Sequence, residues 1–220
     1  MFIGHYGVSY AAKRIAPALP LWVLFLAVQL VDVFWAIFVL LGIERVRIVP
    51  GITATNPLDL YYMPYTHGLL SALAWGVAAY LVWRFWRRGQ GSRAALVLAA
   101  AVFSHWVLDF LVHRPDLPLW GDSAKVGLGL WDYPVVAFIL EVLLFFGGMI
   151  LYLRATHPAS GAQGWEMIAF GIAMVAVHTM VFFGAPPTSP AMAAGMALGS
   201  YVVLAAIAAW LERRRVPRET

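Results

Sequence analysis

The sequence predicts an all-α protein, a polytopic membrane bundle of about six transmembrane helices with a short N-terminal half-helix. Three observations predict this fold class. Of the 220 residues, 62% are hydrophobic and only 12% are charged, which is about half the charged fraction of a typical soluble domain. Six apolar stretches are long enough to cross a bilayer, since a helical span needs roughly 20 residues. The alternating apolar and polar pattern of an outer-membrane barrel is missing.

The predicted spans, in order, cover residues 19–43, 65–86, 94–112, 128–153, 165–183 and 191–211. The first is not a removable signal peptide, because it is too long, contains Gln29 and Asp32, and is followed by no small-residue cleavage site. We expect one transmembrane domain over residues 1–220, in which residues 1–155 carry the polar site and residues 156–220 add two further spans. The sequence contains no cysteine, which excludes disulfides and thiolate chemistry.

The residues before the first span allow two interpretations. Residues 1–15 are mostly apolar and helical in character, and Pro17 and Pro20 end the segment. It is too short to span the membrane. In one interpretation it is a half-helix that starts inside the bundle at His5, roughly 12 Å deep, and reaches the surface at Lys13. In the other it is an amphipathic helix that lies flat on the inner surface.

The basic residues predict the topology. With six spans, three basic groups fall on one side of the membrane, and that side is expected to be cytoplasmic. Both termini are then cytoplasmic, and the loops over residues 44–64 and 113–125 face the other side.

The net charge of +4 is modest, and the basic residues cluster beside the spans, so no nucleic-acid partner is expected. The sequence gives no indication of the oligomeric state. The three basic groups that predict the topology are Lys13 and Arg14; Arg84, Arg87, Arg88 and Arg93; and Arg213, Arg214, Arg215 and Arg218.

Ionisable residues inside the predicted spans indicate a polar site, because such residues are costly in lipid and usually functional or paired. At 1.5 Å per residue, Asp32 lies roughly 18 Å and His105 roughly 15 Å from the inner surface. A shared depth predicts one site joining spans one to four, with Asp32, His67, His105 and Asp109 converging within about 5 Å of one point. The ionisable residues in or at the ends of spans are Asp32, His67, His105, Asp109, His113, Glu141 and His178.

The sharpest local motif is the run from His105 through Asp109 to His113. Spacing of i, i+4 and i+8 places three side chains on one helix face, one turn apart. Imidazole and carboxylate groups at this spacing are typical ligands of zinc or a similar divalent ion. Two alternatives remain open: a proton relay, and a polar stripe that joins helices by hydrogen bonds.

Four further residues carry weaker signals. His5 joins the site if the N-terminal segment enters the bundle. Gln29 lies about one turn before Asp32 and is expected to orient that carboxylate. His178 has no obvious partner and is predicted to make a structural hydrogen bond. Arg114, at the outer interface, either binds a phosphate or extends to the lipid headgroups.

Several segments together resemble the bacterial family of membrane-bound metal-dependent hydrolases. They cover roughly residues 1–155, and the last two spans contribute little. That family is distantly similar to zinc-dependent phospholipase C and P1-type nuclease, which are soluble helical phosphoesterases with three zinc ions. The segments are Gly4-His5 with Ala11-Ala12-Lys13-Arg14; Gln29 to Asp32; Pro64-Tyr65-Thr66-His67-Gly68; Ser104-His105-Trp106 through Asp109 to His113-Arg114-Pro115-Asp116; Gly127 to Trp131; and Glu141.

The resemblance to the soluble enzymes lies in the order of their ligands. In that order come His5, Asp32, His67, His105 with Asp109, His113 and Glu141. The sequence departs in having Ala137 where those enzymes have a histidine four residues before the last acid. It also shows no processing site that would free a new N-terminal amine. The resemblance therefore implies one or two divalent ions of the zinc type rather than three.

The expected function is metal-dependent hydrolysis of a phosphoester in a lipid or lipid-like substrate. The protein is expected to be a multi-pass protein of the bacterial inner (cytoplasmic) membrane. A bound metal would activate water and polarise a phosphoryl oxygen. Its core ligands would be Asp32, His67, His105 and Asp109. His5, His113 and Glu141 would hold a second ion or act as general base. The catalytic residues would be Glu141, His113 and Arg114. The alternatives are a metal-ion or proton transporter that uses the same cluster, and a non-catalytic membrane scaffold.

Overall fold

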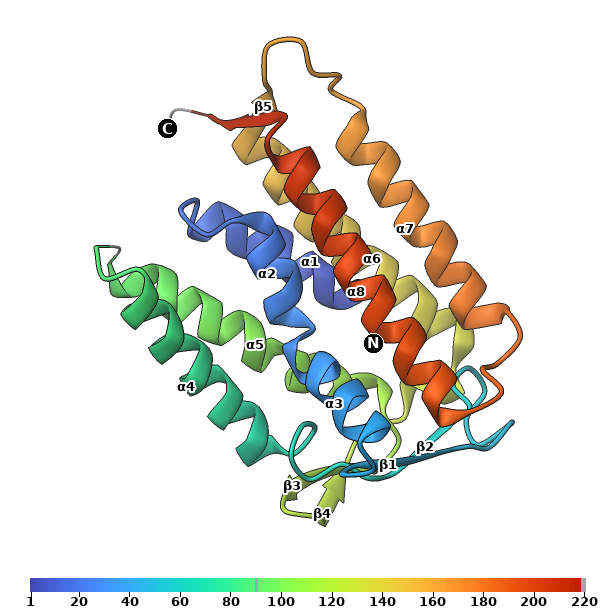
Figure 1. Cartoon of the computed structure of the whole chain (residues 1–220). Helices are drawn as coiled ribbons and strands as arrows, with labels where there is room; N and C mark the ends of the chain where they lie inside the picture. The colour runs from blue at the N-terminus through green and yellow to red at the C-terminus, as the bar shows by residue number, and fades with distance from the viewer. Residues whose placement is uncertain (90, 219–220) are drawn as a thin grey trace.

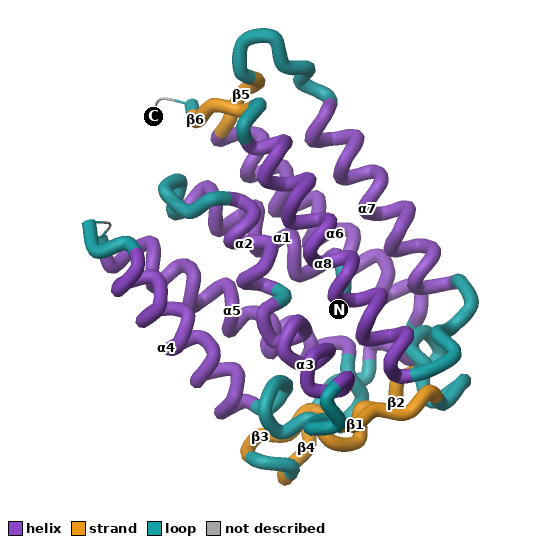
Figure 2. Tube along the Cα trace, viewed as in Figure 1, coloured by secondary structure: helices purple, strands orange, loops and turns teal. Residues whose placement is uncertain are grey.

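The computed structural model describes residues 1–89 and 91–218, and these residues form an all-α bundle, as predicted (Figure 1). Three small two-stranded antiparallel sheets and one 3-10 turn, Leu130–Asp132, complete the described part of the chain (Figure 2). The helices are α1 Ile3–Ile15, α2 Leu21–Val28, α3 Leu30–Leu40, α4 Leu69–Trp86, α5 Ser92–Val112, α6 Pro134–Ala155, α7 Glu166–Phe183 and α8 Pro190–Glu212.

Among the described residues, five helices, α4 to α8, are long and apolar enough to cross a membrane, and the pair α2 and α3 makes a sixth candidate if it is one span. Large apolar side chains such as Val77, Leu143 and Val202 are exposed on the outside of the bundle. Exposed apolar side chains on this scale are costly in water and favourable in lipid. The helices are therefore compatible with a multi-pass membrane protein of about six spans.

The first span is not the continuous helix that was predicted over residues 19–43. α2 and α3 meet at Gln29 with a bend of 55°. In a continuous helix the Val28 carbonyl would accept a hydrogen bond from the N–H of Asp32. Here it accepts one from His105 Nδ1 at 2.7 Å. Irregular backbone is tolerated in the interior of a membrane bundle when protein groups satisfy it, and a side chain on α5 does so here.

The helix α1 lies inside the bundle. His5, Tyr6, Ser9 and Tyr10 have no exposed surface, and α1 packs against α6, α2 and α5. Because lipid offers no hydrogen bonds, a buried helix start needs acceptors for its first N–H groups. Glu141 Oε2 on α6 accepts them from Phe2 N at 2.7 Å and Gly4 N at 3.2 Å. The half-helix interpretation is confirmed, and the surface-helix interpretation is wrong.

The backbones of α1 and α6 touch where two glycines face each other. A Cβ atom on Gly148 would lie 1.9 Å from the Gly7 carbonyl oxygen, and one on Gly7 would lie 2.2 Å from the Leu144 carbonyl oxygen. Small residues allow helices in membranes to approach this closely. The contact fixes the position of α1, and therefore of His5, relative to α6.

The strands lie at the two ends of the bundle and were not predicted. At one end β1 pairs with β2 and β3 pairs with β4, while β5 and β6 pair near the C-terminus at the other end (Figures 1 and 2). The first four strands lie in the segments expected to be outer loops, over residues 44–64 and 113–125. The strands are β1 Arg45–Ile48, β2 Leu58–Tyr62, β3 Leu117–Trp120, β4 Ser123–Val126, β5 Thr156–Pro158 and β6 Arg215–Pro217.

Two apolar clusters fill the bundle, and the polar residues separate them. The larger cluster includes Val28 and Val102, and the smaller one, toward β1–β4, includes Trp35 and Val112. Along α5, His105 and Asp109 come between Val102 and Val112. The buried polar layer therefore lies between two apolar layers.

Candidate metal centre

Three helices and one turn bring the candidate ligands together. α5 carries His105 and Asp109 one turn apart, α3 carries Asp32, α1 carries His5, and the turn before α4 carries His67. Ligand atoms of His5, His105 and Asp109 all lie within 4.8 Å of one another, and so do those of Asp32, His67 and His105. Because His105 belongs to both groups, the five residues form one cluster, which could hold a metal ion.

Asp109 is the centre of the cluster. Its Oδ2 lies 3.0 Å from His105 Nε2, 3.8 Å from His67 Nε2 and 3.6 Å from His113 Nε2. Its Oδ1 lies 3.1 Å from His5 Nε2 and contacts the Met1 amino group. The Asp109 side chain is only 2% exposed. A buried carboxylate surrounded by imidazoles is a suitable ligand set for a divalent cation.

Asp32 forms the second carboxylate of the cluster. Its Oδ1 lies 3.2 Å from His67 Nε2 and 3.5 Å from His105 Nε2. Its Oδ2 accepts a hydrogen bond of 2.8 Å from the Tyr201 hydroxyl on α8. The side chain is 16% exposed, more than those of the histidines that it faces.

The hydrogen bond of His105 determines which of its nitrogens can bind a cation. The Val28 carbonyl can only accept, so His105 Nδ1 must carry the proton of that bond. In the neutral ring, Nε2 then presents a lone pair toward the oxygens of Asp109 and Asp32. This buried Nε2 makes no hydrogen bond within the described residues. A lone pair that faces two carboxylates fits a site for a cation placed between them.

His113 repeats this arrangement. Its Nδ1 lies 2.8 Å from Asp116 Oδ1, and an ionised carboxylate can only accept, so Nδ1 is the donor. Its Nε2 then faces Asp109. Donation of one ring nitrogen to a fixed acceptor is the usual way in which a protein orients a histidine toward a metal.

Glu141 on α6 and His178 on α7 lie beside the start of α1, outside both groups of ligand atoms. Glu141 is 1% exposed, and its Oε2 accepts the two backbone hydrogen bonds at the start of α1. His178 Nε2 lies 4.0 Å from Glu141 Oε2. Neither ring nitrogen of His178 makes a hydrogen bond within the described residues, so the predicted structural hydrogen bond is wrong. His178 instead stacks on Phe138, with 5.1 Å between ring centroids.

Arg114 lies between two carboxylates. Its Nη2 contacts Asp59 Oδ1, and its Nε lies 3.2 Å from Asp116 Oδ2. Arg47 also binds Asp59, at 2.5 Å. Arg114 therefore joins β2 to the end of α5 and, through Asp116, to His113. About a third of its side chain remains exposed.

Several residues at the site were missed or misassigned from the sequence. Gln29, which was expected to orient Asp32, donates from Nε2 to the Phe2 carbonyl at 3.4 Å. Tyr201 binds Asp32 instead. Asp116 lies three residues after His113, and this spacing was the signal that could have revealed the hydrogen bond between them. Tyr201 gave no such signal, because Asp32 lies 169 positions away in the sequence.

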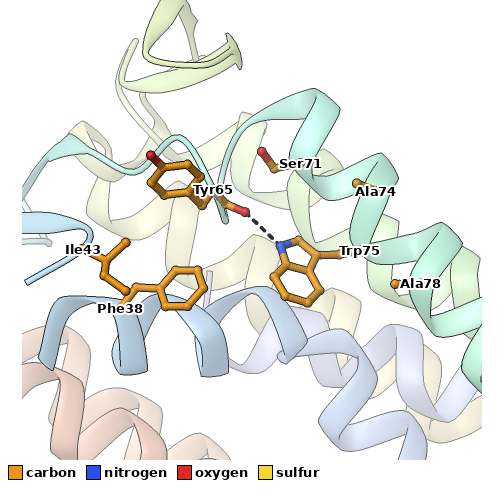
Figure 3. A pocket seen from close by; sticks show the side chains of 7 residues that line it. All are labelled: Phe38, Ile43, Tyr65, Ser71, Ala74, Trp75 and Ala78. Atoms are coloured by element: carbon orange, nitrogen blue, oxygen red, sulfur yellow. Dashed lines mark hydrogen bonds between the residues drawn. The ribbon is translucent and has the colours of Figure 1, made fainter. Parts of the chain in front are cut away.

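A groove opens on the bundle surface between α3 and α4 (Figure 3). Its volume is about 520 Å³, and its walls are mostly apolar. Trp75 Nε1 donates a hydrogen bond of 2.9 Å to the Tyr65 carbonyl across one side of it. None of the candidate ligands lines the groove, but Tyr65 is two residues from His67. The lining residues are Phe38, Ile43, Tyr65, Ser71, Ala74, Trp75 and Ala78.

Comparison of the chain with models of protein families, with curated proteins and with solved structures gives no match.

Proposed function

We propose that this chain is a membrane-embedded metal-dependent hydrolase that acts on a phosphoester of a lipid or lipid-like substrate. One observation carries the proposal: His105 and His113 donate from Nδ1 to fixed acceptors, so both direct Nε2 toward Asp109. Interhelical hydrogen bonding alone would need an N–H on the side that faces the carboxylate. The resemblance to bacterial membrane-bound metal-dependent hydrolases supports the same function.

The residues fit a divalent ion of the zinc type. Asp32, His67, His105 and Asp109 are the proposed core ligands, and His5 extends the set toward α1. A divalent ion bound there would lower the pKa of a water molecule and polarise a phosphoryl oxygen. His113 faces the same carboxylate from the β3–β4 end and is the proposed general base. The hydrogen bonds of Glu141 to α1 support a role in holding His5 in place.

The surroundings of the cluster favour an amphiphilic substrate that enters from the β1–β4 end. Buried polar residues, among them Glu44, Asp59, Thr66 and Asp116, continue from the cluster toward that end. The groove between α3 and α4 offers an apolar surface of suitable size for an acyl chain. We propose that the protein lies in the bacterial inner membrane with its C-terminal end in the cytoplasm, as the positive-inside rule indicates. The expectation of a cytoplasmic N-terminus is wrong, because Met1 lies inside the bundle and its amino group contacts Asp109.

A transporter would need a polar path to both ends of the bundle. Between the cluster and the β5–β6 end lie buried apolar side chains, including Leu24, Phe25, Phe145 and Met149. Such a packed layer would block an ion or a proton. This observation favours the hydrolase over the transporter.

Metal analysis of the purified protein tests the proposal first. We expect one or two divalent ions per chain, with His105→Ala losing most of them and His157→Ala, in the exposed β5 segment, losing none. A metal-free wild-type chain after purification without chelator and exposure to zinc would overturn the proposal.

Activity provides the second test. The metal-loaded protein should release phosphate or a phosphorylated headgroup from phospholipid vesicles or from lipid phosphates. Removal of the metal with a chelator should abolish the reaction, and zinc should restore it. A metal-loaded protein that is inactive on all phosphoester lipids would leave a metal site but contradict the hydrolase.

A further inference from the structure

Glu44 lies outside the cluster but is connected to it by an unbroken chain of short contacts. It lies between α3 and β1, directly before Arg45, and its N–H donates to the Phe38 carbonyl at 3.2 Å. Its side chain is 1% exposed. No motif marked this residue, and the proposed chemistry does not use it. A buried carboxylate next to a candidate metal site therefore needs an explanation.

All contacts of the Glu44 carboxylate are with donors. Oε1 accepts hydrogen bonds from Tyr65 N at 2.8 Å and Thr66 N at 3.0 Å. Oε2 accepts one from the Thr66 hydroxyl at 2.6 Å. Burial raises the pKa of the Glu44 carboxyl, and the hydrogen bonds from Thr66 oppose this by favouring the charged form. Three donors on two oxygens describe a carboxylate that acts only as an acceptor.

This arrangement fixes the direction of the next hydrogen bond. The Thr66 hydroxyl has one proton, and it is used toward Glu44. Thr66 Oγ1 also lies 2.8 Å from His67 Nδ1, so this oxygen must accept and Nδ1 must donate. In the neutral ring, His67 Nε2 then carries only a lone pair. That atom lies 3.2 Å from Asp32 Oδ1 and 3.8 Å from Asp109 Oδ2.

We infer that Glu44 is a positioning residue that, through the Thr66 hydroxyl, holds His67 in the tautomer whose Nε2 faces the cluster as a cation ligand. The inference rests on the proposed metal centre and names a residue that the metal itself would not contact. It places His67 in the same class as His105 and His113, whose Nδ1 atoms also donate to fixed acceptors. Partners of this kind typically change metal affinity by about 10- to 100-fold when removed.

Glu44→Gln is the most direct test, because it keeps the shape of the side chain and reverses the hydrogen bond that the Thr66 hydroxyl donates to it. The amide oxygen can retain the two backbone N–H groups, and the amide N–H then faces Thr66 Oγ1. The Thr66 hydroxyl becomes free to donate to His67 Nδ1, which moves the ring proton to Nε2 and blocks the ligand atom. We expect zinc affinity, measured by competition with a chelator, to fall about 10- to 100-fold.

Thr66 provides a second pair of variants. Thr66→Val removes the hydroxyl and should weaken zinc binding to a similar extent, whereas Thr66→Ser keeps the hydroxyl and should bind nearly as the wild type does. The matched control is Glu166→Gln. Glu166 lies at the start of α7, outside the cluster, and its Oε1 lies 2.6 Å from Arg214 Nη2, so the substitution disrupts only that ion pair. It should leave zinc affinity unchanged.

The tautomer of His67 gives a readout that does not depend on metal. In metal-free protein at alkaline pH, ¹⁵N NMR of ¹⁵N-histidine-labelled chains should show the Nδ1–H tautomer for His67, with His67→Ala assigning the signal. In Glu44→Gln the signal should change to that of Nε2–H. The wild type showing Nε2–H, or a variant with both tautomer and affinity unchanged, would overturn the inference. The tautomer of His67 could differ between the wild type and Glu44→Gln even though the wild type binds no zinc. That outcome would support the role of Glu44 in orienting His67 and reject the metal centre.

Discussion

The carboxylate of Asp32 is contacted at both oxygens, and these contacts fix its orientation in the cluster. His67 and His105 approach Oδ1, while the Tyr201 hydroxyl donates to Oδ2. The donor on Oδ2 limits rotation of the carboxylate and keeps Oδ1 directed at the imidazoles. A ligand held in this way loses less conformational entropy when a cation binds.

Replacing Tyr201 with phenylalanine should therefore weaken cation binding at the proposed metal centre without unfolding the protein. Tyr201→Phe removes only the hydroxyl, and we expect zinc affinity to fall by about 10-fold or more. Chelator competition measures the change. Tyr80→Phe, on α4 against the larger apolar cluster, is the matched control and should bind zinc as the wild type does. Equal affinity in both variants would contradict a role for Tyr201.

The sequence revealed ligand candidates better than it revealed their partners. His105 and Asp109 could be grouped because helical periodicity places residues four apart on one face. Asp32 and His67 followed from depth along their segments. Tyr201 and Glu44 could not be found in this way, because each reaches the site from an element whose position depends on tertiary packing. Periodicity within one helix carries no information about such contacts.

At the level of the elements, the start of α1 is satisfied by a single side chain from another helix. Glu141 Oε2 accepts hydrogen bonds from Phe2 N and Gly4 N inside the bundle. A buried N–H that loses its acceptor costs about 1–3 kcal/mol. Glu141 can therefore act as a cap for α1 whether or not it has a chemical role.

Two substitutions of Glu141 separate these roles. Glu141→Leu should lower the stability by about 2–6 kcal/mol, since two buried N–H groups lose their acceptor. Glu141→Gln keeps an oxygen acceptor and should lower it far less. Thermal unfolding in detergent measures both. Similar losses of stability in the two variants would show that the negative charge, rather than the acceptor, is what α1 requires.

The contact between α1 and α6 gives a second prediction for an element. Gly148→Ala places a Cβ atom where the Gly7 carbonyl oxygen lies, and overpacking of this kind typically costs about 1–3 kcal/mol. Gly147 is the adjacent control, because a Cβ atom there meets nothing within 4 Å. Gly147→Ala should be neutral or slightly stabilising in the helix. Melting temperatures in detergent should fall for Gly148→Ala alone.

Hydropathy predicted the existence of the spans but not the shape of the first one. Mean hydropathy depends only on the composition of a window, so residues 19–43 gave one continuous signal. At the bend beside Gln29, the Val28 carbonyl accepts a hydrogen bond from His105, 77 residues further along the chain. The strands at the ends of the bundle were missed for a similar reason. They are three to five residues long, too short for a periodic pattern.

For the whole molecule, the orientation in the membrane is the main open prediction. The β1–β4 end and the β5–β6 end lie at opposite ends of the bundle (Figure 1). The basic groups predict that the C-terminal end is cytoplasmic. A reporter fused after residue 220 should be active only in the cytoplasm, and one inserted beside Asp122, between β3 and β4, only outside it. The same location for both would require an even number of spans between them, and not the three helices α6, α7 and α8.

The contact between Tyr201 and Asp32 also affects how the protein is made. These residues are separated by 169 positions in the chain, and Tyr201 lies on α8, which leaves the ribosome after α1 to α7. During synthesis, Asp32 enters the membrane long before its hydroxyl donor exists. The carboxylate can reach its final geometry only after α8 has inserted and packed. Capture of a cation at full affinity would then follow completion of the bundle, and metal occupancy would report that assembly had finished.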